Sequence, residues 1–276
     1  MPKTIKDKFM IHPLLSIITV VRNDNEHIAA TMKSVLGQTY PNVEYIILDG
    51  ASTDDTMKRI HETVEDYAQD KEEIELGKEI TCANGKTVTV ISEPDKGVYD
   101  AMNKGIAMSH GAWLNFMNSG DTFHSDTVLE DMKFDEVEWE DAVLYADASV
   151  TYCDGVYLEK PKPFFETYFR FKGIGICHQT MFFPGEIART MKHNLKYRIA
   201  ADYDFANRLY KAGYPFLYRP VTVVYYTWGD GISSNPKGLI PVYKENARVA
   251  EQTWNPFYWA FYLRECWRLW KKRNKD

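Results

Sequence analysis

The chain has 276 residues, of which 45% are hydrophobic, and its formal net charge is -6. This is enough apolar material for one large α/β domain or two small ones, so a disordered chain is excluded. The negative charge argues against a protein that coats nucleic acid, because binding to phosphates requires a basic surface.

The cysteines give no support for a metal site or a disulfide framework. Cys82, Cys153, Cys177 and Cys266 show neither CxxC nor Cys/His ligand spacing. The N-terminal residues lack a sustained apolar region, and no stretch offers about 18 consecutive apolar residues. We therefore expect a cytoplasmic protein that is neither exported nor membrane-spanning.

Strands and helices are predicted to alternate through the first half of the chain. Leu14 to Val21 is an apolar, largely β-branched run, typical of a strand that is buried on both faces. Helical spacing follows over Glu26 to Leu36, and a second buried strand over Val43 to Leu48. A further helix is expected to end at Tyr67, with Ser or Asp side chains as its cap.

An acidic insertion, Glu72 to Val90, interrupts this alternation, and its Asn84-Gly85 pair predicts a two-residue type I′ hairpin turn. The alternation then resumes with a strand over Thr87 to Ile91, a helix over Val98 to Met108 and a strand over Trp113 to Met117. Such a pattern predicts an α/β fold with a mostly parallel sheet, whose strand-end loops form a ligand crevice.

Acidic residues recur where these predicted strands end. They are Asp49, Asp95 and Asp121, joined later by Asp202. One such residue is usually a helix cap, whereas a series facing one crevice is typical of a site for a cation or for sugar and base hydroxyls. The chain has neither GxGxxG after its first strand nor GxxxxGK[ST], which argues against dinucleotide oxidoreductases and P-loop ATPases.

The C-terminal segment differs from the rest in being aromatic and basic. Asn255-Pro256 is a good cap and first-turn pair for a helix. From Arg264 to Asp276 there are six basic and two acidic residues. Such a helix suits the headgroup region of an anionic bilayer, or it docks on the domain or on a partner chain.

The order of motifs resembles the inverting glycosyltransferases of family 2, which have a GT-A fold. The motifs are LLSIITVVRND, SVLGQTYPNVEYIILDGASTDDT, SEPDKGVYDAMNKGIAMSHG, FMNSGDTF, CHQTMFFP and AADYDFANRLYKAGY. The resemblance runs from about Leu14 to Ser234, and within the family it is closest to bacterial exopolysaccharide transferases of the colanic-acid type.

The resemblance implies a donor site for a nucleotide sugar. In the family, the first strand-end loop and the Asp of the second strand hold the nucleoside, which here gives Thr19, Val21, Arg22 and Asp49. A carboxylate suits this role because it accepts hydrogen bonds from uracil or ribose. This chain has Gly50 where the family usually has a second Asp.

The family's DxD metal motif corresponds to Asn118-Ser119-Gly120-Asp121, in which only the last position is acidic. One or two carboxylates suffice for Mn²⁺ or Mg²⁺ when diphosphate oxygens and water complete the shell. We therefore expect Asp121 to be the metal ligand and Asn118 to contact the sugar or support the site. The alternative is that these four residues are only a turn with a helix cap.

An inverting transfer needs a base that takes the proton of the acceptor hydroxyl. The family's base motif falls on Ala201-Asp202, so Asp202 is the expected base. Asp204 is the second choice, or is simply solvated. His178 is a structural hydrogen-bonding residue or, following the resemblance, faces the diphosphate or acceptor.

The stretch Glu93 to Gly105 is expected to lie against the donor nucleotide. Asp95 is the first candidate for a base or ribose contact, and Lys104 the second candidate, for the diphosphate. Asp100 would cap the helix or meet the sugar, and Gly97 would let the backbone approach the ligand. Gly229 to Ser234 resembles the family's glycine-rich loop over the diphosphate.

These readings predict transfer of one sugar from a nucleotide sugar, with UDP as the expected nucleotide, to a lipid-linked or oligosaccharide acceptor in surface polysaccharide assembly. The chain lacks the QxxRW motif of processive synthases. Residues 1–235 would form the GT-A domain, divided at 125/126 into donor and acceptor halves, and residues 236–276 a helical extension on the inner face of the membrane. The alternatives are a nucleotidyltransferase and a non-catalytic nucleotide-sugar-binding module.

Overall fold

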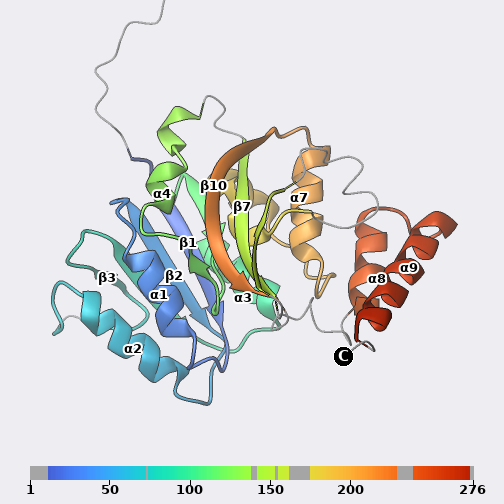
Figure 1. Cartoon of the computed structure of the whole chain (residues 1–276). Helices are drawn as coiled ribbons and strands as arrows, with labels where there is room; N and C mark the ends of the chain where they lie inside the picture. Colours follow the sequence, from blue (N-terminus) through green and yellow to red (C-terminus); the bar gives the residue numbers. More distant parts are fainter. Residues whose placement is uncertain are drawn as a thin grey trace, which may run out of the picture.

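The structure, a computed structural model, describes residues 12–72, 74–137, 142–152, 155–161, 175–228 and 239–273. The predicted alternation of strands and helices is confirmed in the first half of the chain (Figure 1). The strands are β1 (Leu15–Val21), β2 (Val43–Asp49), β3 (Glu79–Thr81), β4 (Thr87–Ser92), β5 (Trp113–Phe116), β6 (Thr122–Phe123), β7 (Val143–Tyr152), β8 (Gly155–Glu159), β9 (Met181–Pro184) and β10 (Phe216–Thr227).

The helices are α1 (Ile28–Leu36), α2 (Thr56–Tyr67), α3 (Val98–Met108), α4 (Val128–Asp131), α6 (Gly185–Met191), α7 (Ala201–Lys211), α8 (Leu239–Val249) and α9 (Pro256–Arg273), with 3-10 turns η1 (Phe134–Glu136) and η2 (His178–Thr180). Helix α3 has the predicted bounds, whereas α1 begins two residues later than its sequence spacing suggested.

A single mixed sheet connects these elements, in the order β3-β4-β2-β1-β5-β9-β7-β10-β6, with β8 beside β7. Strands β4, β2, β1 and β5 are parallel, so their carboxyl ends meet at one edge. Strand β10 is parallel to β7, whereas β3, β6, β8 and β9 pair antiparallel with their neighbours. The mostly parallel sheet expected from the sequence is thus found in the N-terminal half, and antiparallel strands widen it in the second half.

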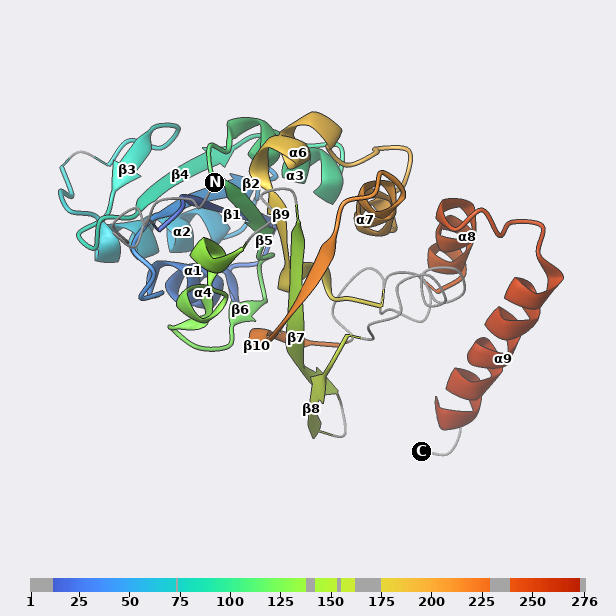
Figure 2. The same cartoon turned by 90° about the horizontal axis from the view of Figure 1, so that it is seen from above.

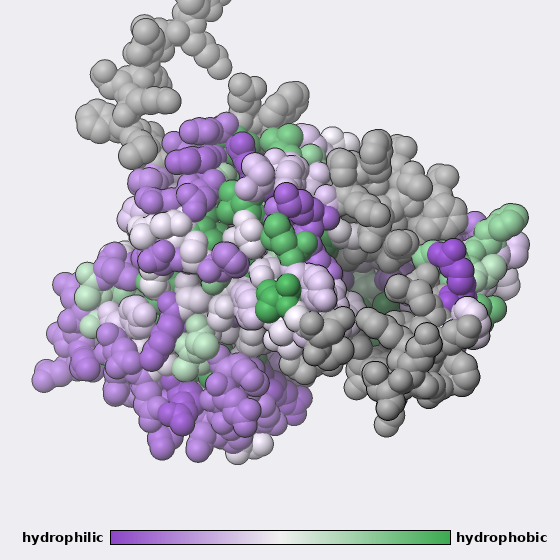
Figure 3. All heavy atoms as spheres, in the orientation of Figure 1, coloured by the Kyte–Doolittle hydropathy of each residue, from purple (hydrophilic) through white to green (hydrophobic). Residues whose placement is uncertain are grey.

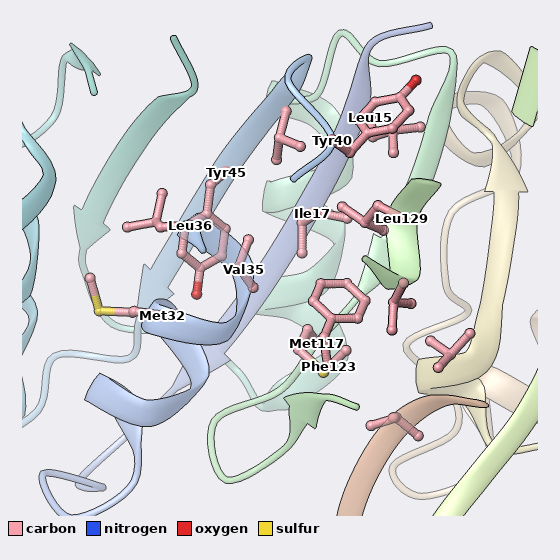
Figure 4. Packing of buried hydrophobic residues seen from close by; sticks show 14 of the residues in the cluster. Leu15, Ile17, Met32, Val35, Leu36, Tyr40, Tyr45, Met117, Phe123 and Leu129 are labelled. Atoms are coloured by element: carbon pink, nitrogen blue, oxygen red, sulfur yellow. The ribbon is translucent and has the colours of Figure 1, made fainter. Parts of the chain in front are cut away.

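Strand β1 is buried on both faces, and its alternating side chains enter two cores. Leu15 and Ile17 pack with α1 and α2 on one face, whereas Ile18 and Val20 pack with α3 and α7 on the other. Figure 4 shows the first core, where Met32, Val35 and Leu36 of α1 lie over the sheet near Tyr45 of β2. The two helical layers flank the sheet in the second view (Figure 2).

The insertion forms a hairpin, but the predicted two-residue turn is wrong. Cys82 N donates to Lys86 O at 2.8 Å, so three residues form the loop, and Gly85 takes the left-handed conformation with φ +83°. Asn84 Nδ2 instead donates to Leu36 O at 2.8 Å, and Lys86 Nζ donates to Gln38 O at 2.7 Å. The hairpin therefore caps carbonyl groups at the C-terminal end of α1.

Helices α8 and α9 pack onto the domain through α7. Asn207 Nδ2 of α7 donates to Val249 O of α8 at 3.1 Å. Helix α9 in turn packs on α8, where Tyr258 Oη donates to Tyr243 O at 3.0 Å. The predicted cap is confirmed, because Asn255 Oδ1 accepts a hydrogen bond from Phe257 N. The predicted domain boundary at residue 235 lies outside the described residues.

The amino ends of β1 and β2 are joined by the buried carboxylate of Glu44. It accepts hydrogen bonds from Ser16 Oγ, from His110 N at 2.8 Å and from His110 Nδ1 at 2.6 Å. Ser16 Oγ also accepts from Gly111 N at 2.8 Å, which brings the loop before β5 into the same network. Glu44 therefore stabilises the edge of the sheet that the amino ends of these strands form. The strand-end acidic residues predicted from the sequence, such as Asp49, belong to the opposite edge.

Substitution Glu44→Gln should lower the free energy of unfolding by about 1–3 kcal/mol, because an amide cannot accept all of these hydrogen bonds. Urea denaturation followed by circular dichroism measures the change. The matched control is Glu62→Gln, which removes an exposed contact with Arg59 and should shift stability by less than about 0.5 kcal/mol. Equal effects of the two substitutions would show that the buried network contributes nothing.

Candidate active site

The strand-end acidic residues gather at one edge of the sheet. The parallel register pairs Val21 of β1 with Asp49 of β2, and Asp49 with Ser92 of β4. Asn118 follows β5, which is the other neighbour of β1. The sequence prediction that these side chains share a crevice edge agrees with this arrangement.

Asp49 is buried, and both of its carboxylate oxygens accept hydrogen bonds from neighbouring serines. Ser52 donates through its backbone N at 3.0 Å and also through its hydroxyl, and Ser92 Oγ donates at 2.6 Å. An ionised carboxylate has about four acceptor positions, so one position remains for a ligand donor. These contacts fix the orientation of the carboxylate at the end of β2.

The absence of a side chain at Gly50 leaves room for the side chains of Arg22 and Asp95, which both lie next to it. A Cβ atom at Gly50 would lie 2.5 Å from Asp95 Oδ2 and 3.3 Å from Arg22 Cδ. The other oxygen of Asp95 accepts a hydrogen bond from Gly97 N at 2.7 Å. Arg22, Asp49 and Asp95, all predicted donor-site residues, therefore lie around one glycine.

Two further predicted donor residues are packed inside the sheet. Thr19 is fully buried, and its hydroxyl donates to Met117 O at 2.6 Å and contacts Tyr45 Oη at 2.9 Å. The Val21 side chain is also buried, while its carbonyl accepts from Gly50 N at 2.9 Å. Their donor-binding role stays a prediction, and what they do here is to hold the strands in register.

Residues Glu93 to Lys104, which lead into α3 and form its first turns, are held in place by contacts with one another. Lys104 Nζ forms an ion pair with Glu93 at 2.6 Å, which raises its pKa, and it also donates to Pro94 O at 2.9 Å. Asp100 accepts from Lys96 N at 3.0 Å, just ahead of α3. Gly97 has φ +123° with open space around its Cα, so its conformation rather than close packing requires glycine.

The Asn118–Asp121 turn places a carboxylate in a largely buried position. Gly120 has φ +95°, and Asp121 N donates to Asn118 O at 3.1 Å. Burial raises the pKa of Asp121 to about 6, although a hydrogen bond from Gln179 acts in the opposite direction. This carboxylate lacks a positive partner strong enough to offset its desolvation.

The Gln179 amide is oriented by the groups on either side of it. Its Nε2 donates to Asp121 Oδ2 at 2.7 Å, and its Oε1 accepts from Cys177 Sγ at 2.7 Å. Burial and the nearby Asp121 charge raise the pKa of the Cys177 thiol well above its usual range, so the thiol stays protonated and donates. Gln179 was not predicted from the sequence, and its adjacency to His178 in the CHQT motif was the available signal.

Asp202, the predicted base, lies at the start of α7 and is joined to the turn by His178. His178 Nδ1 lies 3.5 Å from Asp202 Oδ2, and its Nε2 lies 3.0 Å from Asn118 Nδ2. Since Asn118 Nδ2 is a donor, Nε2 accepts and the ring proton lies on Nδ1, facing the carboxylate. The predicted residues Asn118, His178 and Asp202 thus form one hydrogen-bonded row.

Hydrogen bonds from His178 and Tyr203 keep the Asp202 carboxylate ionised. Burial acts to raise its pKa, but the hydrogen bond of His178 and the Tyr203 backbone N–H hold the pKa below its ordinary value. Tyr203 N lies 2.7 Å from Oδ1 and Tyr99 Oη 3.2 Å from it. Tyr99 belongs to the KGVYDAMNKG stretch and is a contact that sequence reasoning missed.

Asp204 is neither solvated nor placed as a base, which corrects both sequence readings of this residue. It is buried, and its carboxylate forms an ion pair with Arg208 Nε at 2.7 Å, one turn along α7. Arg208 also donates to the carbonyl groups of Met191 and Lys192. Asp204 therefore anchors α7 to the end of α6. The predicted Gly229–Ser234 loop lies outside the described residues.

The turn offers oxygen atoms that suit a hard divalent cation. Among the described residues, Asn118 Oδ1 is buried without a hydrogen-bond partner, and Asp121 has one oxygen not engaged by Gln179. One carboxylate and one amide oxygen fit Mn²⁺ or Mg²⁺ when a ligand's phosphates and water complete the shell. Within the described part of the chain, no group of three or more His, Cys, Asp or Glu side chains could hold a metal by itself.

The fold is that of GT-A glycosyltransferases. The chain is similar to the mannosyltransferase PcManGT of Pyrobaculum calidifontis, solved with GDP-Man and Mn²⁺, with a TM-score of 0.63 and 15% identity over 92% of this chain and 74% of that chain. It is also similar to residues 1–349 of S. aureus TarS with UDP-GlcNAc, with a TM-score of 0.62 and 17% identity over 86% and 66% of the two chains. It spans 39% of the longer TarS chain.

The family follows from the sequence comparison. The model of glycosyl transferase family 2 matches residues 16–211. The chain is 29% identical to a PGL/p-HBAD biosynthesis glycosyltransferase of Mycobacterium bovis, covering 82% of this chain and 81% of that protein. It is also 29% identical to the putative teichuronic acid biosynthesis glycosyltransferase TuaG of Bacillus subtilis, covering 54% and 52%. The chain therefore belongs to glycosyl transferase family 2 and is a glycosyltransferase.

The His178 contact yields a prediction about the base position. Substitution His178→Ala should raise the pKa of Asp202, because it removes a hydrogen bond that favours the ionised carboxylate. Carbon-13 NMR titration of the Asp202 carboxyl group measures this. His61→Ala, which removes an exposed histidine of α2, is the control and should leave Asp202 unchanged. An unchanged titration in His178→Ala would contradict the assigned contact.

Proposed function

We propose that this enzyme transfers one sugar, with inversion, from a nucleotide sugar to a lipid-linked or oligosaccharide acceptor in surface polysaccharide assembly. The observation that carries the proposal is the row Asn118–His178–Asp202, which joins a metal-compatible turn to an ionised carboxylate at one edge of a GT-A sheet. The names of the relatives support the acceptor class, since they act in glycolipid and teichuronic acid biosynthesis.

The nucleoside of the donor is assigned to the end of β1 and β2. Asp49 is held by Ser52 and Ser92 so that its remaining acceptor position is available to uracil N3–H or ribose hydroxyls. Asp95 and the exposed Arg22 both lie next to Gly50. Arg22 would provide a cation for the diphosphate, and Asp95 would provide a carboxylate for the ribose hydroxyls. The similar TarS and PcManGT structures were solved with UDP-GlcNAc and GDP-Man, which supports a nucleotide-sugar donor, and UDP is our proposal for its nucleotide.

Lys104 is assigned a supporting role at this site. Its ammonium group is already paired with Glu93 and with the Pro94 carbonyl, so contact with a diphosphate would require it to exchange these partners. In the arrangement seen here, it holds the Glu93–Gly97 stretch against α3. Asp95 therefore remains the preferred donor contact of that stretch.

Asp121 and Asn118 would hold the divalent cation, Mn²⁺ or Mg²⁺. When bound, the cation neutralises charge that builds on the departing diphosphate. Its positive charge would also offset the burial that raises the pKa of Asp121 to about 6. His178 accepts the hydrogen bond of Asn118 Nδ2, which turns the amide so that Oδ1 is available.

Asp202 takes the proton from the acceptor hydroxyl as its oxygen attacks the anomeric carbon from the face opposite the leaving nucleoside diphosphate. The new glycosidic C–O bond forms as the bond to the diphosphate breaks, and no covalent enzyme intermediate is needed. The lowered pKa keeps Asp202 ionised at neutral pH. Tyr99, Tyr203 N–H and His178 orient the carboxylate for this step.

The test is a screen of nucleotide-sugar donors for slow hydrolysis and transfer, with and without Mn²⁺ or Mg²⁺. Substitution Asp202→Asn should reduce turnover about 10²- to 10⁴-fold, the usual contribution of a general base, while UDP binding measured by calorimetry is retained. Asp147→Asn is the control, since Asp147 is a buried carboxylate of β7 that accepts from Tyr218.

Three results of this screen would contradict the proposal. Full turnover by Asp202→Asn would remove the base assignment. Release of pyrophosphate instead of a nucleoside diphosphate would identify a nucleotidyltransferase. UDP binding without transfer or hydrolysis across a wide panel of acceptors would indicate a binding module.

We also propose that α9 attaches the enzyme to the surface of an anionic membrane. One face of α9 packs on α8 through Tyr258 and Tyr262, whose ring lies 4.4 Å from that of Tyr243. The opposite face and the turn before it expose large apolar side chains, visible at the right of Figure 3. These exposed side chains are Trp254 (94% exposed), Phe257 (78%), Leu263 (65%) and Trp267 (55%).

Charge favours a membrane over a protein partner for this face. The segment from Arg264 to the end of the sequence carries a net charge of +4, from six basic and two acidic residues. Aromatic side chains beside Lys and Arg suit the headgroup region of anionic lipids. No helix in the described ranges is long and apolar enough to cross a membrane.

Replacing Trp254 and Phe257 together by serine should reduce binding to phosphatidylglycerol vesicles at least about tenfold, because it removes two large apolar side chains from the lipid boundary. Cosedimentation measures binding, with phosphatidylcholine vesicles to test the contribution of charge. Leu76→Ser, which replaces an exposed leucine of the insertion, is the control. Sedimentation equal to that of the unmodified protein would exclude lipid as the occupant of this face.

A further inference from the structure

A carboxylate from α8 binds the loop that precedes the predicted base. Glu245 accepts hydrogen bonds from three successive backbone N–H groups, those of Arg198, Ile199 and Ala200. Its Oε2 lies 2.8 Å from Ile199 N and 2.9 Å from Ala200 N. Residues 198–200, here named the base loop, lead directly into α7 and Asp202.

Glu245 places a carboxylate at the start of α7, where the helix's own cap residue offers no side-chain acceptor. The N-cap is Ala200, whose methyl side chain accepts no hydrogen bond. The first N–H groups of a helix need acceptors, and the helix dipole favours a negative charge there. Glu245, 45 residues further along the chain, provides that charge and satisfies the N–H groups just ahead of the first turn.

The base loop is also fixed from its other side, by Tyr99. Tyr99 Oη lies 2.6 Å from Ile199 O, to which it donates, and 3.2 Å from Asp202 Oδ1. Ile199 is thus held at its N–H by Glu245 and at its carbonyl by a side chain that touches the base. A shift of the loop would move Asp202 relative to Tyr99 and His178 together.

We infer that Glu245 is a positioning residue for Asp202, through which the C-terminal helices set the geometry of the catalytic base. The inference rests on the proposed function, in which Asp202 removes the acceptor proton. Glu245 hydrogen-bonds the base loop and not the Asp202 carboxylate, so it acts on orientation. Loss of this contact should slow the chemical step and leave donor binding intact.

Substitution Glu245→Gln tests the inference, because a glutamine has one acceptor oxygen and brings an NH₂ group towards backbone donors. We expect kcat to fall about 10- to 100-fold, the effect of a displacement of about 1 Å in a catalytic group. The KM for the donor and the calorimetric Kd for UDP should be unchanged. Circular dichroism melting establishes that the variant is folded at the assay temperature.

Glu251→Gln is the matched control. It makes the same change in the turn between α8 and α9. It removes the charge that pairs with Lys211 at 2.6 Å, and Lys211 lies at the far end of α7, away from the base loop. Its kcat should equal that of the unmodified enzyme. Equal kcat values for the two variants, or a loss of UDP affinity as large as the loss of kcat in Glu245→Gln, would overturn the inference.

A double substitution separates positioning from general damage. In the Asp202→Asn background, Glu245→Gln should cause no further loss, since no base remains to be positioned. A further loss of the same size would show a structural role alone. If Asp202→Asn itself keeps full turnover, the base assignment fails and the role of Glu245 with it. A loss in Asp202→Asn without one in Glu245→Gln overturns the role of Glu245 alone.

Discussion

The arrangement of this site depends on keeping one carboxylate charged in a place where water is scarce. Burial alone would favour the protonated form of Asp202, and hydrogen bonds from His178 in η2 and from Tyr203 N in α7 oppose it. Tyr99 of α3 lies against the same carboxylate, 3.2 Å from Oδ1. The sheet must therefore bring these elements together before the site exists, so the mixed second half of the sheet is as necessary as the parallel first half.

A second carboxylate of the candidate site, that of Asp121, has a pKa shifted in the direction opposite to that of Asp202. Asp121 has a pKa raised to about 6, whereas the pKa of Asp202 is lowered. His178 donates from Nδ1 towards Asp202, whereas Gln179 donates to Asp121. Two carboxylates whose environments push their pKa values apart suit two different tasks, and those proposed for them are holding a cation and accepting a proton.

Most of the fold followed from local patterns in the sequence. Apolar runs of eight and six residues predicted β1 and β2, and the chain pattern predicted α3 with its bounds, since both depend on neighbours along the chain. The Asn84-Gly85 turn failed, because the distant carbonyl groups at the end of α1 bind the side chains of Asn84 and Lys86. A tertiary contact overrode the local turn preference.

The candidate site shows the same division. Acidic residues at strand ends could be found from the sequence, and Asp202 and His178 from motif order. The structure gave Asp204 a partner one turn away, Arg208, and added Tyr99, Gln179 and Glu245. Pairings such as Tyr99 with Asp202 join residues 103 positions apart, and no spacing rule reports which of many polar residues meet across a fold.

Gly50 carries a consequence for how sequences of this kind can diverge. A side chain there would meet the Asp95 carboxylate at 2.5 Å and the Arg22 stem at 3.3 Å. An aspartate at position 50 would therefore require the Asp95 carboxylate to leave its present place. In this chain the missing side chain of one residue makes room for the charge of another, which is 45 positions away in sequence.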